Sequence, residues 1–190
     1  MKDVIFIPGL GESVKNYKFR QNINVESPLD TIPRNYYLKE FKKQIDPIVH
    51  SIKSRVNHEN VILSARSFGA YLLLQSFIEL NRPFQGVLAL FSPIFGFPLL
   101  YENKQGFPQF IGSKFKYAEI LEVSLDKATF PSPAETHVFY GANDKQCDQS
   151  KCKQVCELAG TRPVILREKG HNLGLQFIES MIEKLADDDN

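Results

Sequence analysis

A serine lies where the chain must turn sharply from a strand into a helix. The residues Val61–Ala70 (VILSARSFGA) begin with an apolar run suited to a buried strand, and an apolar helical pattern follows directly. Ala65 and Gly69 stand two residues before and two residues after Ser67. Side chains this small let the backbone fold back without a collision. We therefore expect the Ser67 hydroxyl to stand exposed above the sheet, where it could act as a nucleophile.

This pattern resembles the nucleophile elbow of the α/β-hydrolase superfamily, which more often has glycine where this chain has Ala65. A five-residue pattern of this kind, small-x-Ser-x-Gly, occurs by chance in many proteins. The preceding strand, the following helix and three further features in the superfamily's chain order strengthen the resemblance, which extends from Val4 to Leu185. The resemblance implies a reduced hydrolase fold that lacks the superfamily's first two strands.

A serine hydroxyl needs a neutral histidine to take its proton. The chain has four histidines: His50, His58, His137 and His171. The first two have the pattern of surface residues, and the third falls inside an expected strand. His171 lies in a KGHN loop between the sixth expected strand and the last helix, at the same carboxyl edge of the sheet as Ser67. Gly170 permits a sharp loop there, which resembles the superfamily's terminal Gly-His loop. We assign His171 as general base and acid.

The imidazole in turn needs a carboxylate that fixes its tautomer. Asp144 ends a Gly-x-x-Asp turn directly after the fifth expected strand, where the superfamily places its acid. Two competitors are Asp148, which fits the first turn of the next helix, and Asp126, which belongs to an irregular segment. The strand after the elbow is the superfamily's other location for the acid, but it ends in Ser92–Pro93 without a carboxylate. The chain order Ser67, Asp144, His171 is the one the fold requires.

A tetrahedral intermediate also needs backbone N–H groups directed at its negative oxygen. Phe68, directly after the nucleophile, would supply one. The loop after the first strand (PGLGES) would supply the other, because the glycines that flank Leu10 allow its amide to turn inward. The superfamily often has His-Gly here, and Pro8–Gly9 leaves the backbone role intact. A nucleotide-phosphate loop is the rival interpretation, but no third glycine follows at the fingerprint spacing and no Walker lysine is present.

Candidate substrate contacts are Arg66, Phe95 and Phe97. Arg66 could steer an acidic substrate group, but it could equally pair with a nearby carboxylate. The two phenylalanines begin a long segment, residues 93–134, that is rich in aromatic, glycine and proline residues. We expect this segment to form a cap or pocket wall that favours an apolar acyl group. The alternative is that it only extends the core.

Short strand-like runs alternate with longer helical stretches, which predicts a three-layer α/β sandwich with a mostly parallel sheet of about six strands. The expected strands are Val4–Ile7, Ile23–Glu26, Asn60–Ser64, Gly86–Phe91, Thr136–Tyr140 and Pro163–Arg167. The expected helices are Ser13–Asn22, Arg34–Val56, Phe68–Leu80, a helix from Lys145 or Asp148 to Ala159, and Leu173–Leu185. Pro47 should kink the second of these helices or split it in two.

Apolar residues make up 43% of the chain and charged residues 24%, which are ordinary values for one globular domain over residues 1–190. A net charge of +1 gives no electrostatic reason to expect nucleic acid or an anionic membrane as a partner. The apolar run Val4–Ile7 is too short for a signal peptide, and no segment approaches the length of a transmembrane helix. We therefore expect a soluble cytoplasmic protein with no membrane span.

Three cysteines, Cys147, Cys152 and Cys156, form a C-x4-C-x3-C run. Such a run could hold a metal or form a redox pair. No second pair and no histidine at zinc-ligand spacing accompanies it, so we expect reduced structural thiols and no metal.

The resemblance implies serine-dependent hydrolysis of a carboxylic ester of a small or medium acyl substrate, through an acyl-enzyme and without a cofactor. A thioesterase or an acyl-carrier-protein methyl ester esterase is the next alternative, in which Arg66, Lys114 and Lys116 would meet an acidic acyl carrier protein. An amidase or peptidase comes third. The contrasting class is a non-catalytic ligand-binding or interaction protein that keeps the fold. Nucleophile, base and acid together favour the enzyme.

Overall fold

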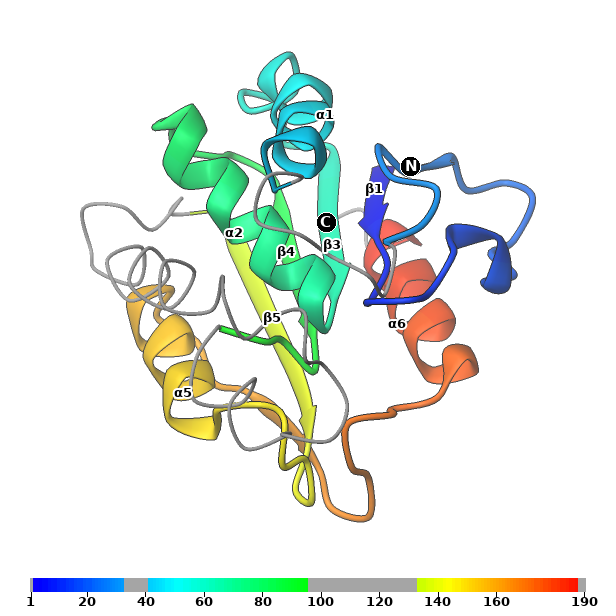
Figure 1. Cartoon of the computed structure of the whole chain (residues 1–190), viewed down its shortest axis with the longest axis vertical. Helices are drawn as coiled ribbons and strands as arrows, with labels where there is room; N and C mark the ends of the chain where they lie inside the picture. Colours follow the sequence, from blue (N-terminus) through cyan, green and yellow to red (C-terminus); the bar gives the residue numbers. More distant parts are fainter. Residues whose placement is uncertain (1, 33–40, 96–132, 188–190) are drawn as a thin grey trace.

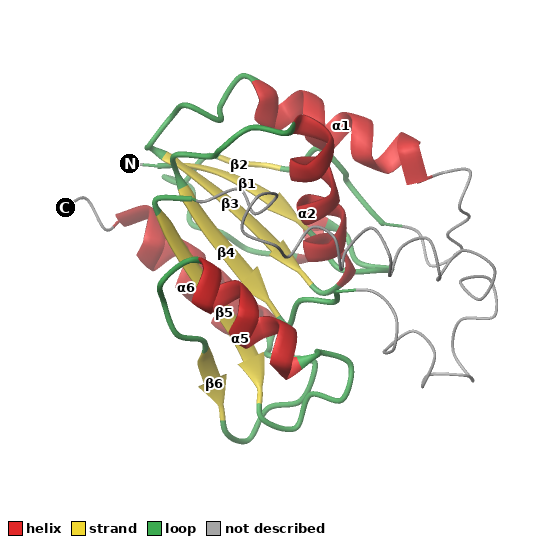
Figure 2. Ribbon diagram, turned by 90° about the vertical axis from the view of Figure 1, so that its left-hand side faces the viewer, coloured by secondary structure: helices red, strands yellow, loops and turns green. Residues whose placement is uncertain are grey.

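A computed structural model describes residues 2–32, 41–95 and 133–187 of the chain. Six parallel strands form one sheet in the order β2-β1-β3-β4-β5-β6, of which Figure 1 labels β1, β3, β4 and β5 and Figure 2 labels every strand. The strands are β1 (Asp3–Ile7), β2 (Val25–Glu26), β3 (Val61–Arg66), β4 (Val87–Phe91), β5 (Glu135–Gly141) and β6 (Val164–Leu166). The helices are α1 (Phe41–Lys53), α2 (Phe68–Leu80), α5 (Gln149–Leu158) and α6 (Leu175–Asp187), with a short 3-10 helix η1 (Val14–Asn16). The expected cap, apart from its first and last few residues, lies outside the described ranges.

Each face of the sheet has its own hydrophobic core, because side chains of a strand alternate between the two faces. Ile7, Leu63 and Leu90 lie on the face that packs against α1, α2 and α5. Phe6, Ile62 and Phe91 lie on the face that packs against α6 (Figure 2). The structure thus confirms the predicted three-layer sandwich with a six-stranded parallel sheet.

The predicted helix Ser13–Asn22 is wrong. Only Val14–Asn16 is helical, as a 3-10 turn in which the Lys15 amide donates to the Ser13 hydroxyl. Tertiary contacts account for the rest of the segment, since Tyr17 is buried in the core beneath α6 and Phe19 packs against that core. Arg20 adds an ion pair with Glu183 of that helix, at 3.2 Å. Packing against a partner helix has overridden the local helical pattern.

Two other boundaries differ from the expectation. Helix α1 continues through Pro47 without being split, and residues 33–40 of the predicted helix lie outside the described ranges. Strand β3 extends two residues further than predicted and ends at Arg66. Ala65 pairs with Ile7 and Leu90 in this extension, and Arg66 pairs with Phe91. Ser67 therefore follows the last residue of the strand directly.

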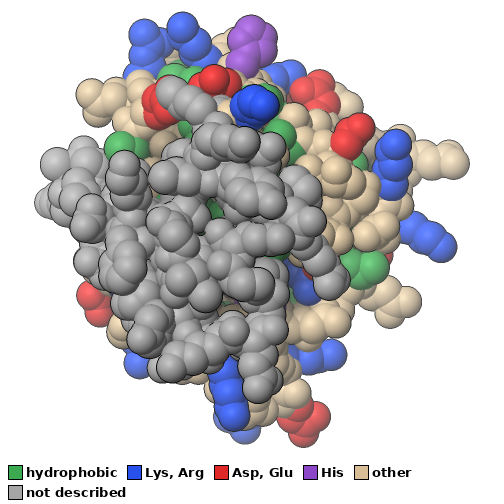
Figure 3. Space-filling model, viewed as in Figure 1, with side chains coloured by type: hydrophobic (Ala, Val, Ile, Leu, Met, Phe, Trp, Pro, Cys, Tyr) green, Lys and Arg blue, Asp and Glu red, His purple; other side chains and the backbone are tan. Residues whose placement is uncertain are grey.

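On the face shown in Figure 3, lysine and arginine side chains are interspersed with aspartate and glutamate. This pattern agrees with a net charge of +1. Within the described ranges, none of the helices combines the length and apolar character needed to cross a membrane.

Candidate active site

The sharp strand-to-helix turn predicted at Ser67 has a strained backbone. Ser67 has φ 53° and ψ −122°, a conformation that costs a residue with a side chain about 1–3 kcal/mol. Hydrogen bonds hold the turn: the Ser67 amide donates to the Phe91 carbonyl at 2.9 Å, and the Ser67 carbonyl accepts from Ala70 and Ile94. Gly69 is required because a Cβ there would lie 2.3 Å from the Pro8 carbonyl oxygen. The expected need for a small residue after the serine thus has a physical basis, the close approach of β1.

The Ser67 side chain does not cap helix α2, although the residue stands at the N-cap position. Its hydroxyl is instead directed toward His171, with 2.8 Å between Oγ and Nε2. The sequence predicted an exposed hydroxyl, yet Ser67 is only 7% exposed. The loop after β1 explains part of this burial, since a Cβ on Gly9 would lie 3.3 Å from the Ser67 Cβ. The serine stands at the sheet edge but is covered.

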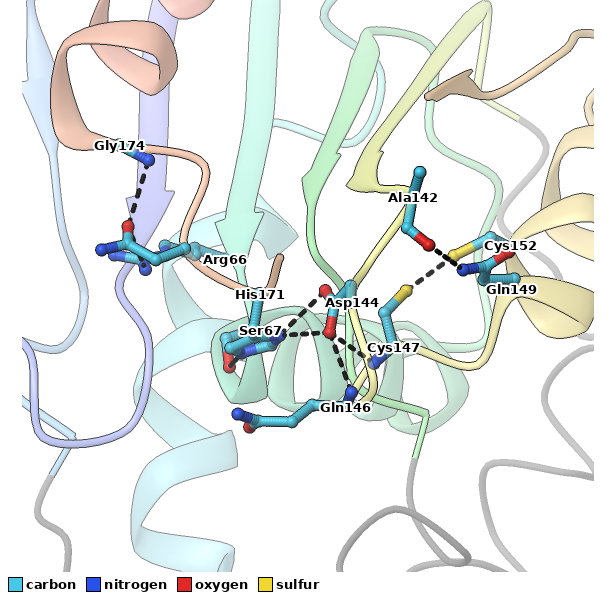
Figure 4. A network of polar contacts seen from close by, with 11 residues as sticks. Arg66, Ser67, Ala142, Asp144, Gln146, Cys147, Gln149, Cys152, His171 and Gly174 are labelled. Atoms are coloured by element: carbon cyan, nitrogen blue, oxygen red, sulfur yellow. Dashed lines mark hydrogen bonds and ion pairs between the residues drawn. The ribbon is translucent and has the colours of Figure 1, made fainter. Parts of the chain in front are cut away.

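Asp144 lies on the far side of the His171 ring (Figure 4). His171 Nδ1 is 3.1 Å from Asp144 Oδ1 and 3.0 Å from Oδ2. An ionised carboxylate can only accept a hydrogen bond, so this contact requires an N–H on Nδ1, and in the neutral ring Nε2 then keeps its lone pair for the Ser67 hydroxyl. The three side chains therefore form a continuous chain of hydrogen bonds from the Ser67 hydroxyl to the Asp144 carboxylate.

The Asp144 carboxylate is held ionised. Burial acts to raise its pKa, but the hydrogen bond from His171 and the charge of that ring lower it. The backbone amides of Gln146 and Cys147, which donate to Oδ1 at 2.8 and 3.0 Å, lower it further. The net result is a pKa below that of an ordinary aspartate. This suits a group that must stay negative beside an imidazolium.

The lowered pKa of Asp144 predicts a pH dependence of stability. Its contribution should be complete above about pH 4, the ordinary pKa of an unfolded aspartate, and should be lost as the pH falls through the lower folded pKa. We expect the difference in unfolding free energy between wild type and Asp144→Asn to shrink over that range. Urea denaturation from pH 6 downward measures it, and a difference independent of pH would contradict the prediction.

The loops that carry Asp144 and His171 are fastened together at the ends of β5 and β6. Ala142 donates to the Leu166 carbonyl at 2.9 Å, and Asn143 donates to the Lys169 carbonyl at 3.0 Å. A Cβ at Gly141 would lie 2.2 Å from the Lys169 carbonyl oxygen and 2.4 Å from that of Gly170. The glycine that this contact requires is therefore Gly141. At Gly170 a Cβ would have only an ordinary contact of 3.7 Å, so the loop does not need a glycine there.

We expect Gly141→Ala to lower the unfolding free energy by about 1–3 kcal/mol, because the clash is with backbone atoms that cannot rotate away. Gly170→Ala is the matched control and should change stability little. Urea denaturation of both variants measures the difference. Equal stability of the two variants would show that the close approach is not needed.

The loop expected to stabilise an oxyanion lies directly beside the serine. Glu12 donates from its amide to the Gly9 carbonyl at 3.0 Å, which closes a four-residue turn around Leu10. Gly11, the third residue of that turn, has φ 74°, a value that glycine adopts without strain. Phe68 is the first residue of α2, so its amide belongs to the positive end of that helix. Leu10 and Phe68, the two residues predicted to donate backbone N–H groups, thus both lie next to Ser67 at the carboxyl edge of the sheet.

Arg66 and Phe95, two of the residues predicted to contact substrate, are buried among other side chains of the protein. Arg66 is 6% exposed and forms an ion pair with Glu12, with 2.5 Å between Nη1 and Oε1. This is the alternative left open by the sequence, a pair with a nearby carboxylate. Phe95 is 2% exposed and belongs to the core that contains α1 and α2. Phe97 lies outside the described residues, as do Lys114 and Lys116.

The described residues that the sequence offered as alternatives to Asp144 and His171 have other partners or lie on the surface. Asp148 is the N-cap of α5, where its carboxylate accepts from the amides of Ser150 and Lys151. His50 and His58 are exposed, and His137 pairs with Glu135 at 2.8 Å. Asp126 lies outside the described residues.

All three cysteines are free and buried. Cys147 Sγ and Cys152 Sγ are 3.1 Å apart, and their hydrogen bond, followed by burial, raises the pKa of Cys147. Burial likewise raises the pKa of Cys156 to about 12. Thiols with raised pKa values are poor nucleophiles. Among the described residues, no group of three or more His, Cys, Asp or Glu is arranged to hold a metal ion.

Comparison with known proteins establishes the fold class. No protein-family model and no curated protein sequence matches the chain. Solved structures do match over nearly its whole length. The ydeN gene product of B. subtilis is 16% identical with a TM-score of 0.66, covering 97% of this chain and 98% of its own. A sugar hydrolase (YeeB) from Lactococcus lactis is 14% identical with a TM-score of 0.64, covering 96% and 88%. Human thioesterase 2 is 18% identical with a TM-score of 0.54, covering 97% and 95%. The chain has an α/β-hydrolase-like fold.

Sequence reasoning missed the polar residues around Arg66. Glu12 and Asn172 contact its guanidinium from two different loops. The sequence held a signal for these contacts, because Glu12 and Asn172 both lie in loops at the carboxyl edge of the expected sheet. Had β3 been extended to Arg66, strand alternation would have placed that side chain on the face opposite Ala65.

Proposed function

We propose that this protein is a serine hydrolase that cleaves a carboxylic ester of a small or medium acyl substrate. The observation that carries the proposal is the chain of contacts from Ser67 Oγ to His171 Nε2 at 2.8 Å and from His171 Nδ1 to Asp144 at 3.0 Å. Asp144, His171 and Ser67 come from three loops that are far apart in sequence, and only the fold brings them together. Such an arrangement activates a serine hydroxyl.

In the proposed reaction, Ser67 Oγ forms a bond to the ester carbonyl carbon while His171 Nε2 takes the hydroxyl proton. The tetrahedral intermediate collapses as the carbon–oxygen bond to the alcohol breaks, and His171 returns the proton to that alcohol. Water then attacks the acyl-enzyme with His171 again as base, which releases the acid and restores the Ser67 hydroxyl. Asp144 stays ionised throughout and stabilises the charged imidazole.

The negative oxygen of each intermediate would be held by the backbone amides of Leu10 and Phe68. The Leu10 turn lies beside Ser67, since a Cβ added to Gly9 would lie 3.3 Å from the Ser67 Cβ. Phe68 opens α2, whose positive end favours an anion.

A thioester is the second candidate substrate, because the same attack on an acyl carbonyl serves both and human thioesterase 2 shares the fold. The test is steady-state hydrolysis of p-nitrophenyl esters and acyl-coenzyme A thioesters of two to twelve carbons. Turnover by wild type and none by Ser67→Ala supports the proposal, and the ratio of kcat/KM values between series assigns the substrate class. Equal rates for both proteins would overturn it. If the protein only binds ligands, wild type should bind these esters or thioesters without turning them over, and Ser67→Ala should bind them equally well.

A further inference from the structure

Arg66 links three loops of the proposed active site. The residue directly precedes Ser67 and is buried, and it pairs with Phe91, whose side chain lies on the face of the sheet that α6 covers. In Figure 4 its side chain extends away from the contacts among Ser67, His171 and Asp144, toward the loop that ends at Gly174. Arg66 therefore stands beside the nucleophile in the chain, but its charged group faces other residues.

On one side the guanidinium contacts the loop that contains Leu10. Arg66 Nη1 lies 2.5 Å from Glu12 Oε1 and 3.3 Å from the Tyr17 hydroxyl oxygen. The other Glu12 oxygen, Oε2, accepts from the Gly9 amide at 3.1 Å and from the Tyr17 hydroxyl at 2.9 Å. Burial raises the pKa of Tyr17, which keeps that hydroxyl protonated and able to donate. The Glu12 carboxylate thus joins Arg66 to the backbone of the turn beside Ser67.

On the other side the guanidinium contacts the loop of the general base. Arg66 Nη2 donates to Asn172 Oδ1 at 3.2 Å, and Asn172 is the residue after His171. The same Oδ1 accepts from the Gly174 amide at 3.1 Å. The Asn172 amide oxygen therefore fastens the backbone that follows His171 to the residue that precedes Ser67.

An arginine suits this place for geometric reasons. Its planar guanidinium presents several donors in a fixed arrangement, so one side chain can serve Glu12, Tyr17 and Asn172 at once. A lysine at the same position would offer a single point charge and could not direct separate hydrogen-bond donors at these three partners. None of these contacts involves the Ser67 hydroxyl itself, so any effect of the network on Ser67 passes through the loops that it holds.

We propose that Arg66 is a positioning residue that holds the Leu10 turn and the His171 loop in place relative to Ser67, acting through Glu12 and Asn172. This inference rests on the proposed function and assigns to Arg66 no contact with substrate. Because misplacing a catalytic group by about 1 Å can cost 10²-fold in rate, loss of the link should slow the chemical step. Substrate affinity should change little.

The exposed end of the network gives the cleanest test. Asn172→Ala removes the shared acceptor, whereas Asn172→Asp keeps an oxygen for Arg66 and Gly174. We expect Asn172→Ala to lower kcat, and the rate of Ser67 labelling by a fluorophosphonate, by roughly 10²-fold with KM unchanged. Asn172→Asp should recover most of that loss. Wild-type rates in Asn172→Ala, or no recovery in Asn172→Asp, would overturn the proposal.

The arginine is tested with a matched control. Arg55 forms an ion pair with Glu26 at 2.8 Å near β2 and is not part of the network. Arg66→Met should lower kcat as Asn172→Ala does, while Arg55→Met should keep the wild-type rate. Thermal unfolding identifies any variant that is not folded.

Failure of the proposed function is recognised separately, by absence of labelling in folded wild type. Hydrogen–deuterium exchange of the segments 8–13 and 168–175 then decides the positioning role without any activity. Faster exchange of these segments in Asn172→Ala than in Arg55→Met supports it. Exchange equal to that of wild type contradicts it.

Discussion

His171→Ala will lower ester turnover by about 10⁶-fold, the size of loss that follows removal of the general base from a serine-hydrolase triad. Without the imidazole, Ser67 loses the base that accepts its proton, because Nε2 is placed 2.8 Å from Oγ. The loss should appear in kcat, since the ring takes part in the chemical step. Steady-state kinetics on the ester that wild type cleaves fastest gives the measurement.

His58→Ala serves as the control for this substitution. His58 is exposed and lies before β3, at the end of the sheet opposite Ser67. Its loss should leave both kcat and KM at wild-type values. A His171→Ala protein that retains wild-type turnover would remove the imidazole from the mechanism.

Asp144→Asn will lower kcat by about 10⁴-fold while the fold is kept. The amide oxygen of asparagine can still accept from the Gln146 and Cys147 amides, as Asp144 Oδ1 does. Its NH₂ group then faces His171 Nδ1 and donates to it, which forces the ring proton onto Nε2. In that tautomer the ring cannot take the Ser67 proton. The fall in kcat comes from the wrong tautomer rather than from unfolding, so the variant should still unfold cooperatively and lose no more stability than the Asp144 carboxylate contributes.

Asp148→Asn is the matched control. Asparagine caps helices as well as aspartate does, so the N-cap of α5 should survive the change. We expect unchanged kinetics for this variant. Loss of activity in Asp148→Asn with wild-type activity in Asp144→Asn would transfer the acid role to the competitor that the sequence offered.

The local part of the site was predictable from the sequence. The tight turn at Ser67 needs a strand before it, a helix after it and Gly69 against β1, and each of these leaves a signal in ten consecutive residues. Parallel strands in this order bring their carboxyl ends to one edge, so loops distant in sequence could be placed together by topology alone. The positions of Asp144 and His171 followed from that rule.

What the sequence could not give are the contacts that depend on tertiary packing. The segment Ser13–Asn22 suggested a helix, yet Tyr17 is buried in the core under α6 and only Val14–Asn16 is helical. The need for glycine at position 141 arises from the backbone of residue 169, which no local pattern reveals. Arg66 likewise gained its partners only once β1, β3 and the His171 loop were assembled.

Covalent labelling tests the central claim most directly. The purified protein is treated with a fluorophosphonate, and the modified residue is mapped by peptide mass spectrometry. The account predicts an adduct on Ser67 in wild type that is absent in Ser67→Ala and almost absent in His171→Ala. Folded wild-type protein that gains no adduct, or that gains one on another residue, would contradict the claim that Ser67 is an activated nucleophile.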